Sequence, residues 1–116
     1  QDSRFYGKFA MIPILEPSNQ QDAYNIMHYA FDLSEELKLP VMIRMVTRLS
    51  HSRSGVTFKE RRTQNGIQLP VDTTRFALIP AHAKKQFEKL VQKKKLLLQS
   101  SEKSPYNKLS LSEDRS

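Results

Sequence analysis

A strand, a helix and a second strand follow one another between residues 12 and 46, and this order constrains the fold more than any other feature of the sequence. The first apolar run, IPILE, is closed by Pro17, and the second, Val41 to Val46, begins after Pro40. The segment between the prolines is long enough for about five helical turns. A helical crossover joins parallel strands and is almost always right-handed. We therefore predict a βαβ unit whose two strands lie in one parallel sheet.

The segment between the two prolines has the pattern of one amphipathic helix. Ser18 is predicted as its N-cap, with Gln21 completing a capping box and Asp22 adding a negative charge that the helix dipole favours. Apolar residues recur at spacings of three and four, and two more widen the stripe. These residues are Ala23, Met27, Ala30, Leu33 and Leu37, with Ile26 and Phe31.

The second strand is almost continuously apolar, which is typical of a parallel sheet covered on both faces. One βαβ unit cannot cover both faces of its own sheet. The rest of the sheet is therefore expected either in another chain or in a longer protein to which these residues belong. We favour the longer protein, and the absence of an initiator Met before Gln1 agrees with it.

The two halves of the chain differ in charge. Residues 1–58 hold six basic and six acidic residues, whereas residues 59–116 hold thirteen and six and so carry the whole net charge of +7. This asymmetry indicates two different kinds of segment. Together with the element pattern, it leads us to expect an α/β part over residues 1–58 and a small hairpin or strand with a basic connector helix over residues 59–99. Residues 100–116 have no periodicity and are expected to be a linker to a following domain.

Weak patterns follow the second strand. Asn65-Gly66 is a hairpin turn signal between short alternating apolar segments, and Arg75 to Ile79 is predicted as one more short strand. A helix is expected from Pro80, with an apolar stripe along one face and lysines on the other faces. The Lys84–Lys95 segment would suit a small basic module that binds nucleic acid or an acidic partner. Because few aromatic residues accompany the lysines, nucleic acid is disfavoured and a solvated connecting helix is preferred.

Several kinds of site are excluded by composition. The chain has no cysteine, so it contains no disulfide, thiolate metal site or iron–sulfur cluster of its own. His28, His51 and His82 lack the spacing of a helical zinc motif, and no metal site is predicted. No apolar run approaches the roughly 20 residues of a membrane span, and no signal peptide is visible. We expect a cytoplasmic protein without a membrane partner.

A polar cluster follows the second strand: Thr47, Arg48, Ser50 and His51. Ligands of open parallel α/β sheets bind outside the carboxyl ends of the strands. Arg48 could bind a carboxylate or phosphate through its forked guanidinium, and His51 could exchange a proton near neutral pH. The alternative is a solvated loop whose residues pack on the next segment.

Longer blocks of sequence carry a family resemblance. QDSRFYGKFAMIPILEPSNQQDAY and AFDLSEELKLPVMIRMVTRLSHSRSGV resemble the alpha subunits of indolepyruvate ferredoxin oxidoreductases, and DTTRFALIPAHAKK and SPYNKLSLSEDRS fit the segments that follow. These enzymes belong to the thiamine-diphosphate-dependent 2-oxoacid:ferredoxin oxidoreductases. The resemblance covers essentially the whole chain. It implies that the chain is the second half of a pyrimidine-binding α/β domain, followed by its helical connector.

The resemblance also implies a chemistry for the parent enzyme, an oxygen-sensitive oxidoreductase of amino-acid catabolism in anaerobes. It would oxidatively decarboxylate an aryl pyruvate with thiamine diphosphate and Mg, join the acyl group to coenzyme A and pass electrons through [4Fe-4S] clusters to ferredoxin. Its partners would be the remainder of the alpha subunit and a beta subunit. The activating glutamate, the magnesium–diphosphate motif and the cluster cysteines of the family are absent here. We therefore expect this chain alone to be inactive.

The resemblance adds candidate site residues but assigns none of them a catalytic step. Arg48 and His51 match the turn after the closing strand of the pyrimidine domain, which suggests a place beside the cofactor or substrate cleft. Asp2 and Arg4 belong to a block that follows the preceding strand in the family, so they are expected to line the same cleft. Asp2 and Arg4 could also form a local ion pair.

Overall fold

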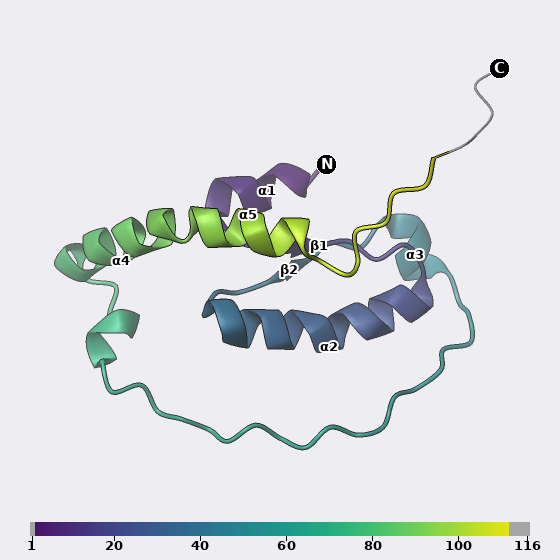
Figure 1. Ribbon diagram of the computed structural model, residues 1–116, viewed down its shortest axis with the longest axis horizontal. Coiled ribbons are helices and arrows are strands. Elements are labelled where there is room, and N and C mark those ends of the chain that lie inside the picture. Colours follow the sequence, from purple (N-terminus) through teal and green to yellow (C-terminus); the bar gives the residue numbers. More distant parts are fainter. Residues whose placement is uncertain (1, 112–116) are drawn as a thin grey trace.

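The computed structural model describes residues 2–111, which fold into a mixed α/β arrangement (Figure 1). Two short strands lie near the centre of the view, with helices above and below them. In chain order the elements are α1 (Arg4–Ala10), β1 (Ile14–Leu15), α2 (Gln20–Leu37), β2 (Met42–Ile43), α3 (Thr47–His51), the 3₁₀ helix η1 (Thr73–Phe76), α4 (Pro80–Gln92) and α5 (Lys94–Glu102). Within residues 2–111, none of the helices is both long and apolar enough to cross a membrane.

The two strands pair in parallel, with Ile14 opposite Met42 and Leu15 opposite Ile43. The predicted order of strand, helix and parallel strand is therefore confirmed. Each strand is shorter than expected, at two residues. Pro13 has no N–H to donate to the ladder, although its carbonyl accepts from the Met42 N–H at 2.9 Å. The sheet has two strands among the described residues, so neither strand has a second neighbour to lengthen it.

α2 begins one residue later than the sequence suggested. Its N-cap is Asn19, whose side-chain oxygen accepts from the N–H of Asp22 at 2.8 Å. The prediction of Ser18 as N-cap is wrong, because the Ser18 hydroxyl donates instead to the Asp22 carboxylate. Asn19 has an extended backbone, which directs its amide oxygen to the third helical N–H. The helix ends at Leu37, and Lys38 turns the chain with a left-handed φ of 52°.

The hydrophobic core is small. The buried hydrophobic residues of the described chain are Ile26, Ala30, Leu33 and Leu37 of α2 and Leu49 of α3. All four α2 residues belong to the predicted apolar stripe, so that face of the helix is confirmed. Met27 and Phe31 were predicted on the same stripe but are 44% and 68% exposed. The radius of gyration is 17.6 Å, against roughly 13 Å for a compact domain of this length.

α1 was not predicted from the sequence. It is a seven-residue helix with little amphipathic pattern, and it packs against β1 at Ile14. Gly7 is buried at this contact. A Cβ atom on Gly7 would lie 3.0 Å from the carbonyl oxygen of Ile12 and would overlap the side chain of Ile14. The contact therefore needs glycine, for space rather than for an unusual backbone angle.

The segment between β2 and η1 corrects two predictions. Thr47–His51, expected as the turn after a longer strand, forms the helix α3. Residues 52–72 contain no helix or strand, so the hairpin predicted at Asn65-Gly66 is wrong. The two-residue hairpin turn that Asn-Gly favours needs a positive φ at its glycine, and Gly66 does not have one. The start of the segment lies along α2 instead, because the Gln21 side chain exchanges hydrogen bonds of 2.8 and 3.2 Å with the backbone of Thr57.

The strand predicted over Arg75–Ile79 is also wrong, because η1 occupies Thr73–Phe76. The Asp72 carboxylate stabilises this turn by accepting from the N–H of Thr74 at 3.0 Å and from its hydroxyl at 2.5 Å. A side chain that caps a turn competes with the extended backbone that a strand requires.

The predicted helix from Pro80 is confirmed, but it is divided into α4 and α5 at Lys93. α5 continues through Glu102, so the first three residues of the segment expected as a linker are helical. Residues 103–111 contain no helix or strand, and the rest of the predicted linker, residues 112–116, lies outside the described residues.

Candidate functional site

An ion pair lies at the carboxyl end of the sheet. Glu16 directly follows β1, Arg44 directly follows β2, and the Arg44 guanidinium donates to the Glu16 carboxylate. The Arg44 side chain is 18% exposed, and the Glu16 side chain is 39% exposed. We call these two residues the strand-end pair. The pair joins the two strands where their backbone ladder stops.

Asp2 and Arg4 form a second ion pair beside α1. The Arg4 Nε atom donates to both oxygens of the Asp2 carboxylate at 2.9 Å, and the Arg4 N–H donates to the same carboxylate at 3.0 Å. The Arg4 side-chain hydrogen bond is the main reason why the pKa of Asp2 lies well below its usual range, and the charge of Arg44 contributes in the same direction. The Asp2 hydrogen bond raises the pKa of Arg4, with a smaller contribution from Glu16. The two pairs are therefore close enough to influence each other electrostatically.

The structure brings Asp2 and Arg4 near the strand-end pair but leaves the other two candidates apart. Arg48 and His51 lie on α3, which begins three residues after Arg44, and both are exposed. Within residues 2–111, no hydrogen bond or ion pair connects either of them to Asp2 or Arg4. Leu49 is the buried residue of α3 and anchors the helix.

The site also includes residues that the sequence reasoning missed. Glu16 and Arg44 were each included in a predicted strand without a role. The sequence held part of a signal, because Glu16 and Arg44 each directly follow two apolar residues of a predicted strand. The observed register, which pairs Leu15 with Ile43, makes Glu16 and Arg44 the next pair along. Opposite charges at paired positions of neighbouring strands predict an ion pair.

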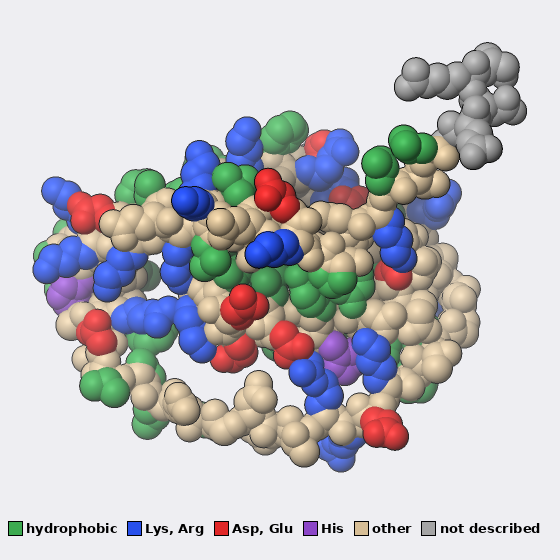
Figure 2. All heavy atoms as spheres, viewed as in Figure 1, with side chains coloured by type: hydrophobic (Ala, Val, Ile, Leu, Met, Phe, Trp, Pro, Cys, Tyr) green, Lys and Arg blue, Asp and Glu red, His purple; other side chains and the backbone are tan. Residues whose placement is uncertain are grey.

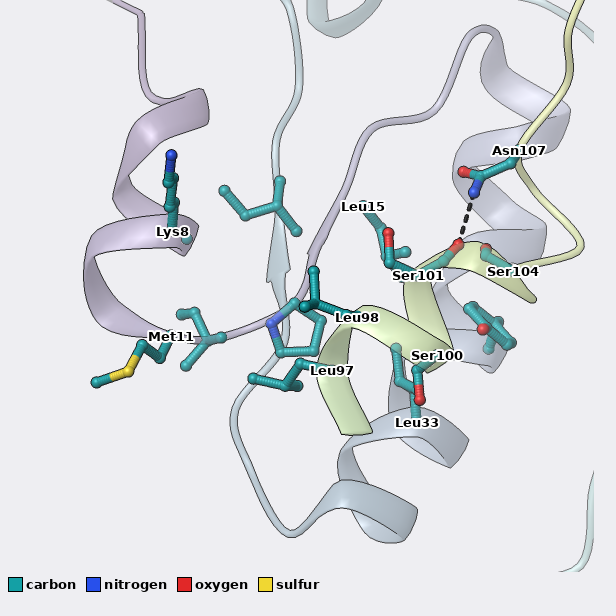
Figure 3. A pocket seen from close by; sticks show the side chains of 15 residues that line it. Lys8, Met11, Leu15, Leu33, Leu97, Leu98, Ser100, Ser101, Ser104 and Asn107 are labelled. Atoms are coloured by element: carbon teal, nitrogen blue, oxygen red, sulfur yellow. Dashed lines mark hydrogen bonds between the residues drawn. The ribbon is translucent and has the colours of Figure 1, made fainter. Parts of the chain in front are cut away.

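A mostly apolar cavity of about 310 Å³ lies between α1, β1, α2 and α5 (Figure 3). Lys8 and Met11 line it from α1 and the turn after it, and Leu33 lines it from α2. From α5 and the residues after it come Leu97, Leu98, three serines and Asn107, which donates to the Ser101 carbonyl at 2.6 Å. The candidate residues at the strand ends do not line this cavity, so the charged site and the apolar cavity are separate.

The described residues contain no group of three or more His, Cys, Asp or Glu side chains that could hold a metal ion. His28 packs edge-on against Tyr24 at a centroid distance of 5.2 Å, and His51 lies on α3. His82 lies on α4, and its Nδ1 atom is buried without a hydrogen-bond partner in the part of the chain that the structure describes. Among residues 2–111, the guanidinium groups of Arg4 and Arg44 each pair with a carboxylate, and the strand ends show no nucleophile beside a base.

Comparison with curated proteins finds relatives over nearly the whole chain. The indolepyruvate oxidoreductase subunit IorA of Methanothermobacter marburgensis is 39% identical over 98% of this chain. The subunits of the same name from Thermococcus kodakarensis and Pyrococcus abyssi are 37% and 33% identical over the same share. In all three comparisons the match covers 18% of the relative, so this chain spans about a fifth of the length of these relatives. No protein-family model and no solved structure matches the chain.

Proposed function

We propose that this chain, which is homologous to a segment of the IorA subunits of indolepyruvate oxidoreductases, works as one part of such an enzyme subunit. Sequence identity of 33–39% over 98% of the chain is the observation that carries the proposal. It also confirms the resemblance that the sequence blocks indicated. The comparisons give no support to the alternative of a free-standing basic binding module.

The small core supports a dependent role. Phe9 on α1 is 87% exposed and Phe31 on α2 is 68% exposed, although a globular domain normally buries such side chains. A two-stranded parallel sheet also leaves strand edges that natural proteins pair or cover. We propose that the rest of the subunit covers these faces and extends the sheet, and that the isolated chain has no oxidoreductase activity.

For the whole enzyme we propose oxidative decarboxylation of an aryl pyruvate. Thiamine diphosphate would supply the carbanion chemistry, coenzyme A would accept the acyl group, and iron–sulfur clusters would pass electrons to ferredoxin. The described residues offer no set of oxygen ligands for Mg, and the chain has no cysteine for a cluster. We therefore propose that these groups are held by other parts of the alpha subunit and by a beta subunit.

The contribution proposed for this chain is a wall of the substrate or cofactor cleft. The carboxyl ends of parallel strands are the usual place for such a cleft, and α3 and the strand-end pair lie there. Arg48 is exposed on α3, and its guanidinium suits the carboxylate of a 2-oxoacid. His51, Asp2 and Arg4 are proposed beside it, as residues that shape the cleft and its charge.

Arg48→Gln in the full-length subunit, assembled with its partner, tests this assignment. We would measure indolepyruvate-dependent reduction of a viologen dye and compare kcat and KM with the unaltered enzyme. Loss of one charged hydrogen bond to the substrate carboxylate should lower kcat/KM by about tenfold or more. Arg53→Gln is the matched control, because Arg53 is an exposed arginine just beyond α3.

Two results would contradict the proposal at different levels. Equal kcat/KM in the Arg48→Gln and Arg53→Gln enzymes would remove Arg48 from the cleft. Failure of the unaltered, fully assembled enzyme to oxidise any aryl pyruvate would overturn the proposed activity itself.

A further inference from the structure

A second cavity, of about 560 Å³, lies between the end of α2, η1 and α4. Its lining includes four cationic side chains: Lys38, Arg75, Lys89 and Lys93. Asp72 is the acidic residue of the lining, and Gln86 adds an amide. Figure 2 shows Lys and Arg side chains gathered over α4, at the left of the view. We call this hollow the basic cavity.

Two carboxylates offset only part of the positive charge around the basic cavity. The pKa of Asp72 is lowered mainly by its hydrogen bond from the Thr74 hydroxyl and to a smaller extent by the charge of Lys89. The Asp72 carboxylate accepts two hydrogen bonds from Thr74, at 3.0 and 2.5 Å. Lys38 pairs with Glu35 at 3.3 Å, but both side chains are more than half exposed, so the pair is weak. Within residues 2–111, neither Arg75, Lys89 nor Lys93 forms an ion pair with a carboxylate.

A hydrogen bond fixes the position of Lys93 in the wall of the basic cavity. Its Nζ atom donates to the carbonyl oxygen of Leu37 at 2.5 Å, at the end of α2, where the helix dipole is negative. Burial lowers the pKa of Lys93, and the positive charge of Arg75 lowers it further. Two cationic groups that repel each other across a hollow are stabilised by an anion that lies between them.

We infer that the basic cavity binds a small anion that carries a phosphate or diphosphate group. The guanidinium of Arg75 can donate two parallel hydrogen bonds to phosphate oxygens, and Lys89 can add a point charge. The volume lies within the range of small-molecule sites. The cationic groups surround a hollow formed by three elements rather than following one face, which favours a compact anion over a nucleic-acid backbone.

The test is calorimetric titration of the full-length protein that contains these residues with inorganic pyrophosphate and with inorganic phosphate. Arg75→Gln and Lys89→Gln should each weaken pyrophosphate binding by about tenfold. Lys84→Gln is the matched control. It removes the same charge from α4, but Lys84 is outside the lining and lies on the opposite side of the helix from Lys89 and Lys93. This control should bind pyrophosphate as the unaltered protein does.

The variants distinguish binding in the basic cavity from binding elsewhere and from general charge attraction. Lys93 is left intact because its bond to Leu37 also holds the helices together. A pyrophosphate site elsewhere in the protein would not respond to Arg75→Gln or Lys89→Gln. Unchanged binding in both variants would overturn the inference, and so would equal weakening by Lys84→Gln, which would indicate general charge attraction. Tighter binding of pyrophosphate than of phosphate would assign a diphosphate, and the reverse a single phosphate group.

Discussion

Phe9 offers the sharpest test of whether other parts of a subunit cover this chain. Its side chain is 87% exposed on α1, whereas that of Leu37 is 1% exposed on α2. In the chain alone, Phe9→Ala should change the local free energy of opening by less than about 0.5 kcal/mol, because little buried area is lost. Leu37→Ala should cost about 3 kcal/mol. Three buried carbons account for roughly 2.4 kcal/mol at about 0.8 each, and the residual cavity adds the remainder.

The same two substitutions in the full-length subunit separate the alternatives. If the rest of the subunit packs on α1, Phe9 is buried there and Phe9→Ala should cost roughly 3 to 5 kcal/mol. Leu37→Ala should cost about the same in both proteins. Amide hydrogen exchange of peptides from α1 and α2 measures the local opening free energy in each case. A cost below about 0.5 kcal/mol for Phe9→Ala in the full-length subunit would refute the reasoning that α1 is an internal interface.

Three further results are expected. Gly7→Ala should destabilise the chain by about 1 to 2 kcal/mol in urea unfolding, because overlap with β1 outweighs a helix-propensity gain near 1 kcal/mol. The control is Gly55→Ala, whose new methyl group has no atom within 4 Å and should have no such effect. Equal costs for the two substitutions would contradict the packing argument. Arg44→Gln should cost about 1 kcal/mol in thermal unfolding because it leaves the strand-end carboxylate without its partner, and an unchanged midpoint would show that the pair does not hold the strands. The Asp2 carboxyl should titrate below 3.8 in carbon NMR, and Arg4→Gln should return its pKa toward 3.8. Because the pKa of Asp2 is lowered in the folded state, this pair stabilises the fold at pH values above 3.8, and the contribution is lost as the pH falls toward the lowered pKa. A normal pKa for Asp2 in the unaltered chain would count against the ion pair.

The predictable part of the fold is the part that carries a long periodic signal. α2 has 18 residues, and its buried positions repeat at the spacing that a helix imposes, so one face could be identified without coordinates. Two short apolar segments on either side of a helix permit few arrangements, and parallel pairing is the usual one. The sheet therefore followed from the order of elements rather than from strand length.

The elements that were predicted wrongly or missed share a different cause. A turn signal such as Asn65-Gly66 forms a hairpin only if strands on both sides find partners, and the residues before it bind to α2 instead. The Gln21 side chain and the Tyr24 hydroxyl hold Thr57 and Lys59 through hydrogen bonds that connect positions 35 or 36 residues apart. α1 likewise depends on a contact with β1. Long-range contacts of this kind override weak local preferences and leave no periodic trace in the sequence.

The helix α3 explains why the residues after β2 are polar, so their polarity is weaker evidence for a binding site. A five-residue helix that buries only Leu49 leaves its other side chains exposed, so Thr47, Arg48, Ser50 and His51 would be polar whether or not they touch a ligand. Position is the stronger argument. α3 begins three residues after Arg44, at the carboxyl end of a parallel strand, where ligands of such sheets bind. Polarity alone would favour Arg48 and Arg53 equally, whereas position favours Arg48, and the paired Arg48→Gln and Arg53→Gln enzymes distinguish the two reasons.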